Sequence, residues 1–184
     1  MNRRRLLAMV GVLALPGCSD VGAPSTVSST DEASRVTSSS SGATCEPGAV
    51  FRPSPPEGTD PEPSEYPKKP GTLSADSVAT YLSEFETTFG RNRAIDELVS
   101  TSVDVEIQGG FEGSEAGDGY VASSNVQVMF TTDADGTETA VGDIKYVANY
   151  YVDPELVYRH QTDIEPMDPR DSDRKLLVQC GSTA

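Results

Sequence analysis

The sequence predicts an α+β domain in which one long helix packs on a four- to five-stranded antiparallel sheet. Two patterns support this prediction. Up to Val99, apolar residues recur every three or four positions, which places them on one face of a helix. After Ser100 they alternate with polar residues, which is the period of a strand with one buried face. A helix followed by such strands implies two layers, with the helix covering the apolar face of the sheet.

The helix is expected to run from Ala75 to about Leu98. Ser74 is a suitable N-cap, and Asp76 lies in the first turn, where the helix dipole favours an acid. Gly90 weakens the helix by about 1 kcal/mol relative to alanine and marks a possible bend. The expected buried face consists of Val78, Tyr81, Leu82, Phe85, Phe89, Ile95, Leu98 and Val99. The expected solvent side consists of Glu84, Glu86 and Thr87.

Strands are expected over residues 103–108, 120–130, 144–152 and 156–161, with a short last strand over 175–179. The glycine-rich stretch 109–119 predicts a bulge or a loose turn, and the Asp135-Gly136 dipeptide predicts a hairpin. The order of a helix and then a meander is similar to that of cystatin-like folds and of the larger nuclear-transport-factor-like domains. This resemblance is topological and implies no function.

Residues 1–17 have the pattern of an export signal. Three arginines precede the apolar run from Leu6 to Leu15, which is shorter than the roughly 20 apolar residues that a membrane-spanning helix needs. The run ends in Pro16-Gly17-Cys18, where a small residue precedes a cysteine. The signal is therefore expected to end directly before Cys18.

This segment resembles the signals of twin-arginine-exported lipoproteins. Arg3, Arg4, Leu6 and Leu7 match the twin-arginine motif, and Leu15 to Cys18 matches a lipobox. The resemblance implies export of a folded protein, attachment of membrane lipid to Cys18, and a position on the outer face of the cytoplasmic membrane. An uncleaved anchor, or a secretory signal cut at another position, is the alternative.

The charge of the chain is strongly negative. Met1–Gly17 holds three of the 14 basic residues and none of the 29 acidic ones, so the mature chain has a formal charge of −18. Dense carboxylates with few lysines suit concentrated salt, which screens their repulsion. With its signal, the chain resembles lipoproteins of halophilic archaea; an acidic bacterial lipoprotein is the alternative. Nucleic acid is excluded as an expected partner, because phosphate binding needs clustered basic residues.

Residues 18–66 are rich in serine, threonine and proline and are expected to form a disordered linker, followed by a globular domain over residues 67–184. With Cys18 assigned to lipid, Cys45 and Cys180 remain as an even pair outside the cytoplasm, where a disulfide is expected. Two free thiols are the alternative. With a bridge, the proline-rich segment is expected to lie along the domain.

No motif predicts catalysis, a metal or a cofactor. The stretch Asp133–Glu138 resembles the start of a calcium loop but lacks the terminal acid of an EF-hand, so a turn is expected. His160 is the only histidine, which argues against a His/Cys zinc site and a Ser/His/Asp triad. Tyr151 and Arg159 are expected to face outward from adjacent strands as a candidate binding patch.

Two functional classes remain from the sequence, and a surface spacer or stress-related coat protein is a third possibility. The first is a non-enzymatic, lipid-anchored envelope domain that binds a ligand or an envelope protein. The second is a small extracytoplasmic enzyme with a cavity like those of cystatin-like and nuclear-transport-factor-like folds. A deep pocket with two carboxylates, or with His160 beside one, favours the enzyme, whereas a filled core with an exposed aromatic patch favours binding.

Overall fold

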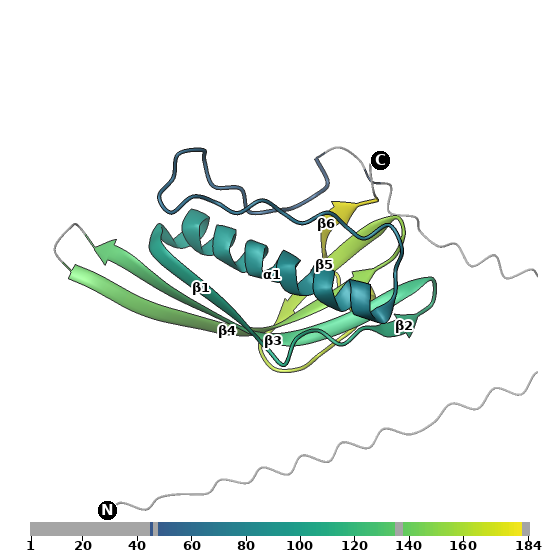
Figure 1. Ribbon diagram of the computed structural model, residues 1–184. Coiled ribbons are helices and arrows are strands. Elements are labelled where there is room, and N and C mark those ends of the chain that lie inside the picture. Colours follow the sequence, from purple (N-terminus) through teal and green to yellow (C-terminus); the bar gives the residue numbers. More distant parts are fainter. Residues whose placement is uncertain (1–44, 46–47, 135–137, 182–184) are drawn as a thin grey trace, which may run out of the picture. The chain divides into compact units, whose positions relative to one another are not determined.

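The computed structural model describes Cys45, residues 48–134 and residues 138–181. It confirms the predicted fold class, because one helix packs against an antiparallel sheet (Figure 1). In chain order the elements are α1 (Ala75–Leu98), β1 (Ser100–Gln108), β2 (Ser114–Ala116), β3 (Gly119–Ala134), β4 (Glu138–Val152), β5 (Leu156–Thr162), the 3-10 helix η1 (Pro169–Asp171) and β6 (Leu176–Cys180).

The sheet has six strands in the order β1-β3-β4-β5-β6, and β2 pairs with β3. β3 and β4 pair along nearly their whole length, from Tyr120 opposite Val152 to Ala134 opposite Glu138. β1 therefore shares the other edge of β3 with β2. The short β2 is the strand that the sequence did not predict, since glycines surround its three residues.

Helix α1 has the predicted ends. The Ser74 side chain accepts a hydrogen bond from the backbone N–H of Ser77, and the Ser77 side chain accepts one from the backbone N–H of Ser74, which forms a capping box. The helix continues through Gly90, where a Cβ atom would lie 3.2 Å from a methyl group of Val128. Gly90 therefore permits a close approach between the helix and the sheet.

The core lies between α1 and the sheet. Phe85 and Tyr150 meet edge to face at 6.0 Å, and Phe111 contacts Tyr150 in the same way at 5.6 Å. The other buried apolar side chains of the core include Val78, Leu82, Phe89, Val126, Val128, Val152, Val157 and Val178. Both predicted apolar faces, one helical and one stranded, thus meet in one layer. Val99 was expected on the buried face of the helix, and this expectation is wrong, because Val99 is the C-cap of α1 and is 78% exposed.

The structured part of the chain begins earlier than predicted. Residues 48–66, here called the strap, were expected to be disordered linker, but they pass over α1 on the side away from the sheet (Figure 1). The backbone N–H of Phe51 donates to the Leu177 carbonyl at 2.8 Å, and Arg52 Nε donates to the Val178 carbonyl at 2.6 Å. These bonds fasten the strap to β6 at the edge of the sheet.

The strap also contacts the helix. Asn92 of α1 accepts from the backbone N–H of Ser64 and donates to its carbonyl, both at 2.8 Å. The Arg52 guanidinium lies 5.5 Å from the centre of the Phe85 ring, and Pro53 is buried. Polar bonds to backbone groups and packed rings therefore compensate the entropy of ordering a segment that has no helix or strand of its own.

Candidate functional site

A buried polar cluster lies between α1 and the sheet. Glu86 and Arg159 are 0% and 2% exposed, and their side chains form a bidentate ion pair. Arg159 Nη2 lies 2.7 Å from Glu86 Oε1, and Arg159 Nε lies 2.9 Å from Oε2. The hydroxyl of Tyr146 donates to Oε1 and that of Tyr150 to Oε2. Each carboxylate oxygen of Glu86 therefore accepts two hydrogen bonds.

The tyrosine hydroxyls and the guanidinium of the cluster have raised pKa values and stay protonated. Burial, followed by the nearby Glu86 carboxylate, raises the pKa of the Tyr146 and Tyr150 hydroxyls well above the usual value, so both stay protonated donors. Burial is the largest single effect and lowers the pKa of Arg159, but the charge and hydrogen bonds of Glu86 together with the two tyrosines outweigh it, so that the guanidinium pKa is raised overall. Glu86 was expected on the solvent side of the helix, and this expectation is wrong.

The predicted outward patch of Tyr151 and Arg159 is also wrong. Across the β4–β5 ladder, Arg159 stands opposite Tyr150, and Tyr151 stands opposite Tyr158. Residues directly opposite in an antiparallel pair share a face, so Arg159 shares the helix-covered face with Tyr150. Tyr151 lies on the other face, and the two side chains cannot form one surface.

Tyr151 is covered as well. The guanidinium of Arg170, from η1, lies 4.2 Å from the centre of the Tyr151 ring, which is 6% exposed. Asp168 holds Arg170 in place through an ion pair of 2.6 Å. The segment between β5 and β6, which contains η1, therefore packs on the face of the sheet that carries Tyr151.

A cleft opens beside the buried cluster, with a volume of about 270 Å³. Three arginines line it, Arg93 from α1, Arg159 from β5 and Arg174 from the residues before β6, and we call it the arginine cleft. Phe51 of the strap, Phe89 of α1 and Leu176 of β6 provide its apolar walls. Basic groups are few in this acidic chain, so their concentration here distinguishes this cleft.

The three arginines are engaged to different degrees. Arg93 bonds to Glu97 and Gln161, each at 2.9 Å. Arg159 uses Nε and Nη2 for Glu86, whereas its Nη1 makes no hydrogen bond to any described residue. The Arg174 guanidinium likewise makes none within the described residues. The cleft therefore offers donors from a buried and a rim arginine to an incoming acceptor.

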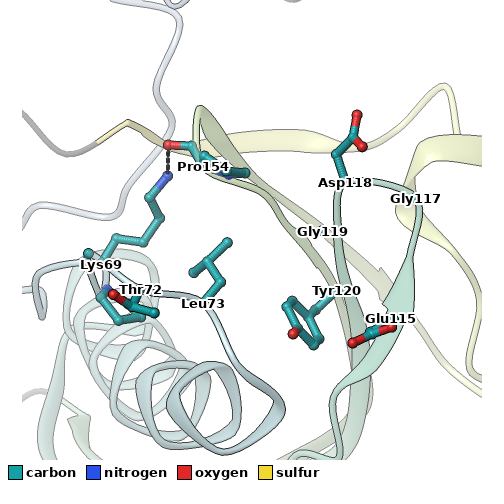
Figure 2. Close-up of a pocket in the computed structure, with 11 residues that line it drawn as sticks. Lys69, Thr72, Leu73, Glu115, Gly117, Asp118, Gly119, Tyr120 and Pro154 are labelled. Carbon is teal, nitrogen blue, oxygen red and sulfur yellow. Dashed lines mark hydrogen bonds between the residues drawn. The ribbon is translucent and has the colours of Figure 1, made fainter.

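A second cleft of about 580 Å³ lies at the other end of the helix, and we call it the lysine cleft. Figure 2 shows Lys69 and Leu73, from the approach to α1, on one side, and Tyr120 with Glu115, from β3 and β2, on the other. Pro154 closes one end (Figure 2). Sequence patterns did not indicate this site, because its residues come from three separate segments.

Lys69 is the unusual group of the lysine cleft. Its residue is 6% exposed, and its ammonium donates to the carbonyls of Asp153 at 2.8 Å and Pro154 at 2.7 Å. An ammonium has three donors, so one remains after these two bonds. Burial lowers the pKa of Lys69, partly offset by Asp153 and Glu155. The lysine joins the approach to α1 to the turn between β4 and β5.

The structure joins Cys45 and Cys180 in a disulfide, with their Cα atoms 5.6 Å apart. The proline-rich strap then lies along the domain, as was expected for a bridged chain. The export residues Arg3, Arg4, Leu6 and Leu7 and the predicted lipid-bearing Cys18 lie outside the described residues. Among the described residues, no helix has the length and apolar character needed to cross a membrane.

His160 and the predicted turn at Asp133–Glu138 were the two places at which a metal site was considered. In Cys45, 48–134 and 138–181, no group of three or more His, Cys, Asp or Glu residues is arranged to hold a metal ion. His160 lies with its Nδ1 3.4 Å from the Ser172 hydroxyl, on the face that the β5–β6 segment covers. The hairpin turn predicted at Asp135-Gly136 lies outside the described residues.

Comparisons of the chain with protein-family models, with curated proteins and with solved structures find no match. The two clefts and the sequence signals are therefore the features of the chain that bear on its function.

Proposed function

We propose that this chain is a lipid-anchored envelope protein whose folded domain binds a small anionic ligand, such as a carboxylate, in the arginine cleft without catalysing a reaction. The observation that supports this most is the free Nη1 of Arg159, a side chain 2% exposed that lines the cleft beside Arg93 and Arg174. Guanidinium groups bind carboxylates through paired, charge-assisted hydrogen bonds.

The two kinds of arginine have different tasks in this proposal. Glu86 neutralises Arg159, so Nη1 supplies a directed hydrogen bond more than a net charge. Arg93 and Arg174 supply the positive charge, and only Glu97 opposes them among the carboxylates of the lining. Phe51 and Phe89 lie 6.3 Å apart and give an apolar contact for the body of the ligand. The volume is close to the lower limit of small-molecule sites, about 300 Å³.

The enzyme alternative is less well supported. His160 and Glu97 both line the arginine cleft, which was the arrangement expected of an enzyme. However, Glu97 pairs with Arg93 at 2.9 Å, and the His160 ring lies against the Ser172 hydroxyl. The other candidate base is Glu86, but both oxygens of that carboxylate already accept hydrogen bonds from Arg159 and from tyrosine hydroxyls. A general base must reach the proton that it removes, and these four donors surround Glu86 in the core. Binding without chemistry is therefore the function that we propose.

Substitution of Arg174 tests the proposed site. The full chain, in a neutral detergent, is titrated with acetate, benzoate and succinate and followed by calorimetry. We expect saturable binding of at least one of these anions, weakened about fivefold by Arg174→Gln because an exposed charge contributes up to about 1 kcal/mol. Added salt should also weaken it, because the rim charges are screened.

Lys145→Gln is the matched control, since it removes one exposed positive charge that lies outside the cleft. It should leave the affinity unchanged within about twofold. Failure of all three anions to saturate the protein, or equal losses in Arg174→Gln and Lys145→Gln, would exclude the arginine cleft as the site.

Substitution of Cys18 tests the anchor. Two lipid chains on one residue hold a protein firmly, whereas a single myristoyl chain binds only marginally. A Cys18→Ser chain is therefore expected in the medium or as an unprocessed precursor, as membrane fractionation with mass measurement can show. Its retention in the membrane at the mature mass would contradict lipidation at this residue.

A further inference from the structure

The lysine cleft combines apolar side chains with both hydrogen-bond donors and acceptors. Its volume, about 580 Å³, lies within the range of about 300–1,000 Å³ that is usual for small-molecule sites. Tyr120, half-buried, presents its ring toward Leu73 (Figure 2). The Glu115 carboxylate lies beside this ring, and the Lys69 ammonium, with one unused donor, lies on the opposite wall (Figure 2).

The charges of the lining restrict the ligand. Glu115 and Asp118 are both exposed carboxylates at the β2–β3 side and repel an anion. The buried Lys69 ammonium repels a cation on the other side. A neutral ligand that donates a hydrogen bond to the Glu115 carboxylate and accepts one from the Lys69 ammonium suits both walls of the cleft. Hydroxyl groups do both.

Two glycines of the cleft wall are required by the backbone around them. At Gly119 an added Cβ atom would lie 2.3 Å from the Val152 carbonyl oxygen, so no side chain can replace this glycine without a shift of the backbone. Gly117 has a φ of 69°, in the left-handed region that favours glycine. The wall between Glu115 and Tyr120 therefore remains bare backbone at two positions.

We propose that the lysine cleft is a second binding site and that it takes a neutral, hydroxyl-rich ligand, namely a sugar residue of a free saccharide or of a glycan. The ring of Tyr120 stacks on the apolar face of the sugar, Glu115 accepts from its hydroxyls, and the third donor of Lys69 bonds to one of its oxygens. This site is independent of the anion site, because the two clefts share no lining residue.

The test uses the full chain in a detergent without a sugar headgroup. Methyl glycosides of glucose, mannose, galactose and N-acetylglucosamine are the probes, and saturation-transfer NMR reports their binding. We expect at least one to bind saturably, with an affinity that falls about fivefold in Glu115→Gln, because an amide forms a weaker hydrogen bond than a carboxylate. Tyr120→Leu should give a similar loss, because leucine has no flat ring.

Glu106→Gln is the matched control, since Glu106 is an exposed acid of β1 outside the cleft. The affinity of the Glu106→Gln chain for the glycosides should equal that of the unchanged chain. Thermal melts of all variants show whether each one folds. The proposal is overturned if none of the glycosides binds, or if Glu106→Gln weakens binding as much as Glu115→Gln does.

The salt response separates the two sites. Sugar binding through hydrogen bonds and stacking should stay constant as salt rises, whereas anion binding in the arginine cleft should weaken. Anion binding should also be unchanged in Glu115→Gln. If only sugar binding or only anion binding is absent, the result shows which of the two proposals has failed. Competition of a charged amine with the glycosides would contradict a neutral ligand in the lysine cleft.

Discussion

Replacement of Glu86 by leucine is expected to lower the free energy of unfolding by about 3–5 kcal/mol. The substitution leaves the Arg159 guanidinium in the core without its counter-charge and removes the acceptor of the Tyr146 and Tyr150 hydroxyls. Each unsatisfied buried group adds a desolvation cost. Equilibrium unfolding of the full chain in denaturant measures the loss.

Two further variants distinguish the effect of breaking the buried ion pair from the effect of placing a leucine in α1. Glu84→Leu changes an exposed acid of the same helix and should alter the free energy of unfolding by less than about 0.5 kcal/mol. Glu86→Leu with Arg159→Met removes both charges and should cost less than the two single substitutions together. Additive losses in this pair would mean that Glu86 and Arg159 act separately.

Removal of the disulfide is expected to have the second large effect. Cys45 and Cys180 are 135 residues apart, and the chain-entropy model gives about 5 kcal/mol as the upper limit for closing a loop of this length. The double variant Cys45→Ser, Cys180→Ser should therefore unfold at a clearly lower denaturant concentration than the oxidised chain. The reduced wild-type chain serves as the control and should match the double variant.

Peptide mapping without reductant provides a direct check. It should yield one cross-linked fragment that contains Cys45 and Cys180. Alkylation of both thiols in protein taken from the envelope, together with an unchanged unfolding midpoint in the double variant, would contradict the bridge.

The sequence predicts the helix well because its signals are local. The Ser74 cap and the spacing from Val78 to Phe89 depend only on neighbours along the chain, and the structure has the helix at Ala75–Leu98 as expected. The alternation in residues 103–107 and 144–152 predicts strands for the same reason. The fold class follows from these local patterns without any long-range information.

The candidate sites depend on partners far apart in the sequence, and here the prediction fails. Glu86 was assigned to solvent because it is charged, although it lies four residues after Leu82 and three before Phe89, next to the apolar stripe. Its burial requires Arg159, which is 73 residues away. The strap was misjudged similarly, since its prolines and serines indicate disorder until β6 and α1 provide partners.

The position of the disulfide decides how the folded domain bears mechanical tension. A pull on the residues before Cys45 passes through the covalent bond to Cys180 and so enters the sheet at the end of β6. The strap, which begins after Cys45, is bypassed and stays unloaded. When the bond is reduced, the same pull reaches the hydrogen bonds of Phe51 and Arg52 first. The strap then peels from β6, and Phe51 leaves the wall of the arginine cleft before the sheet is strained.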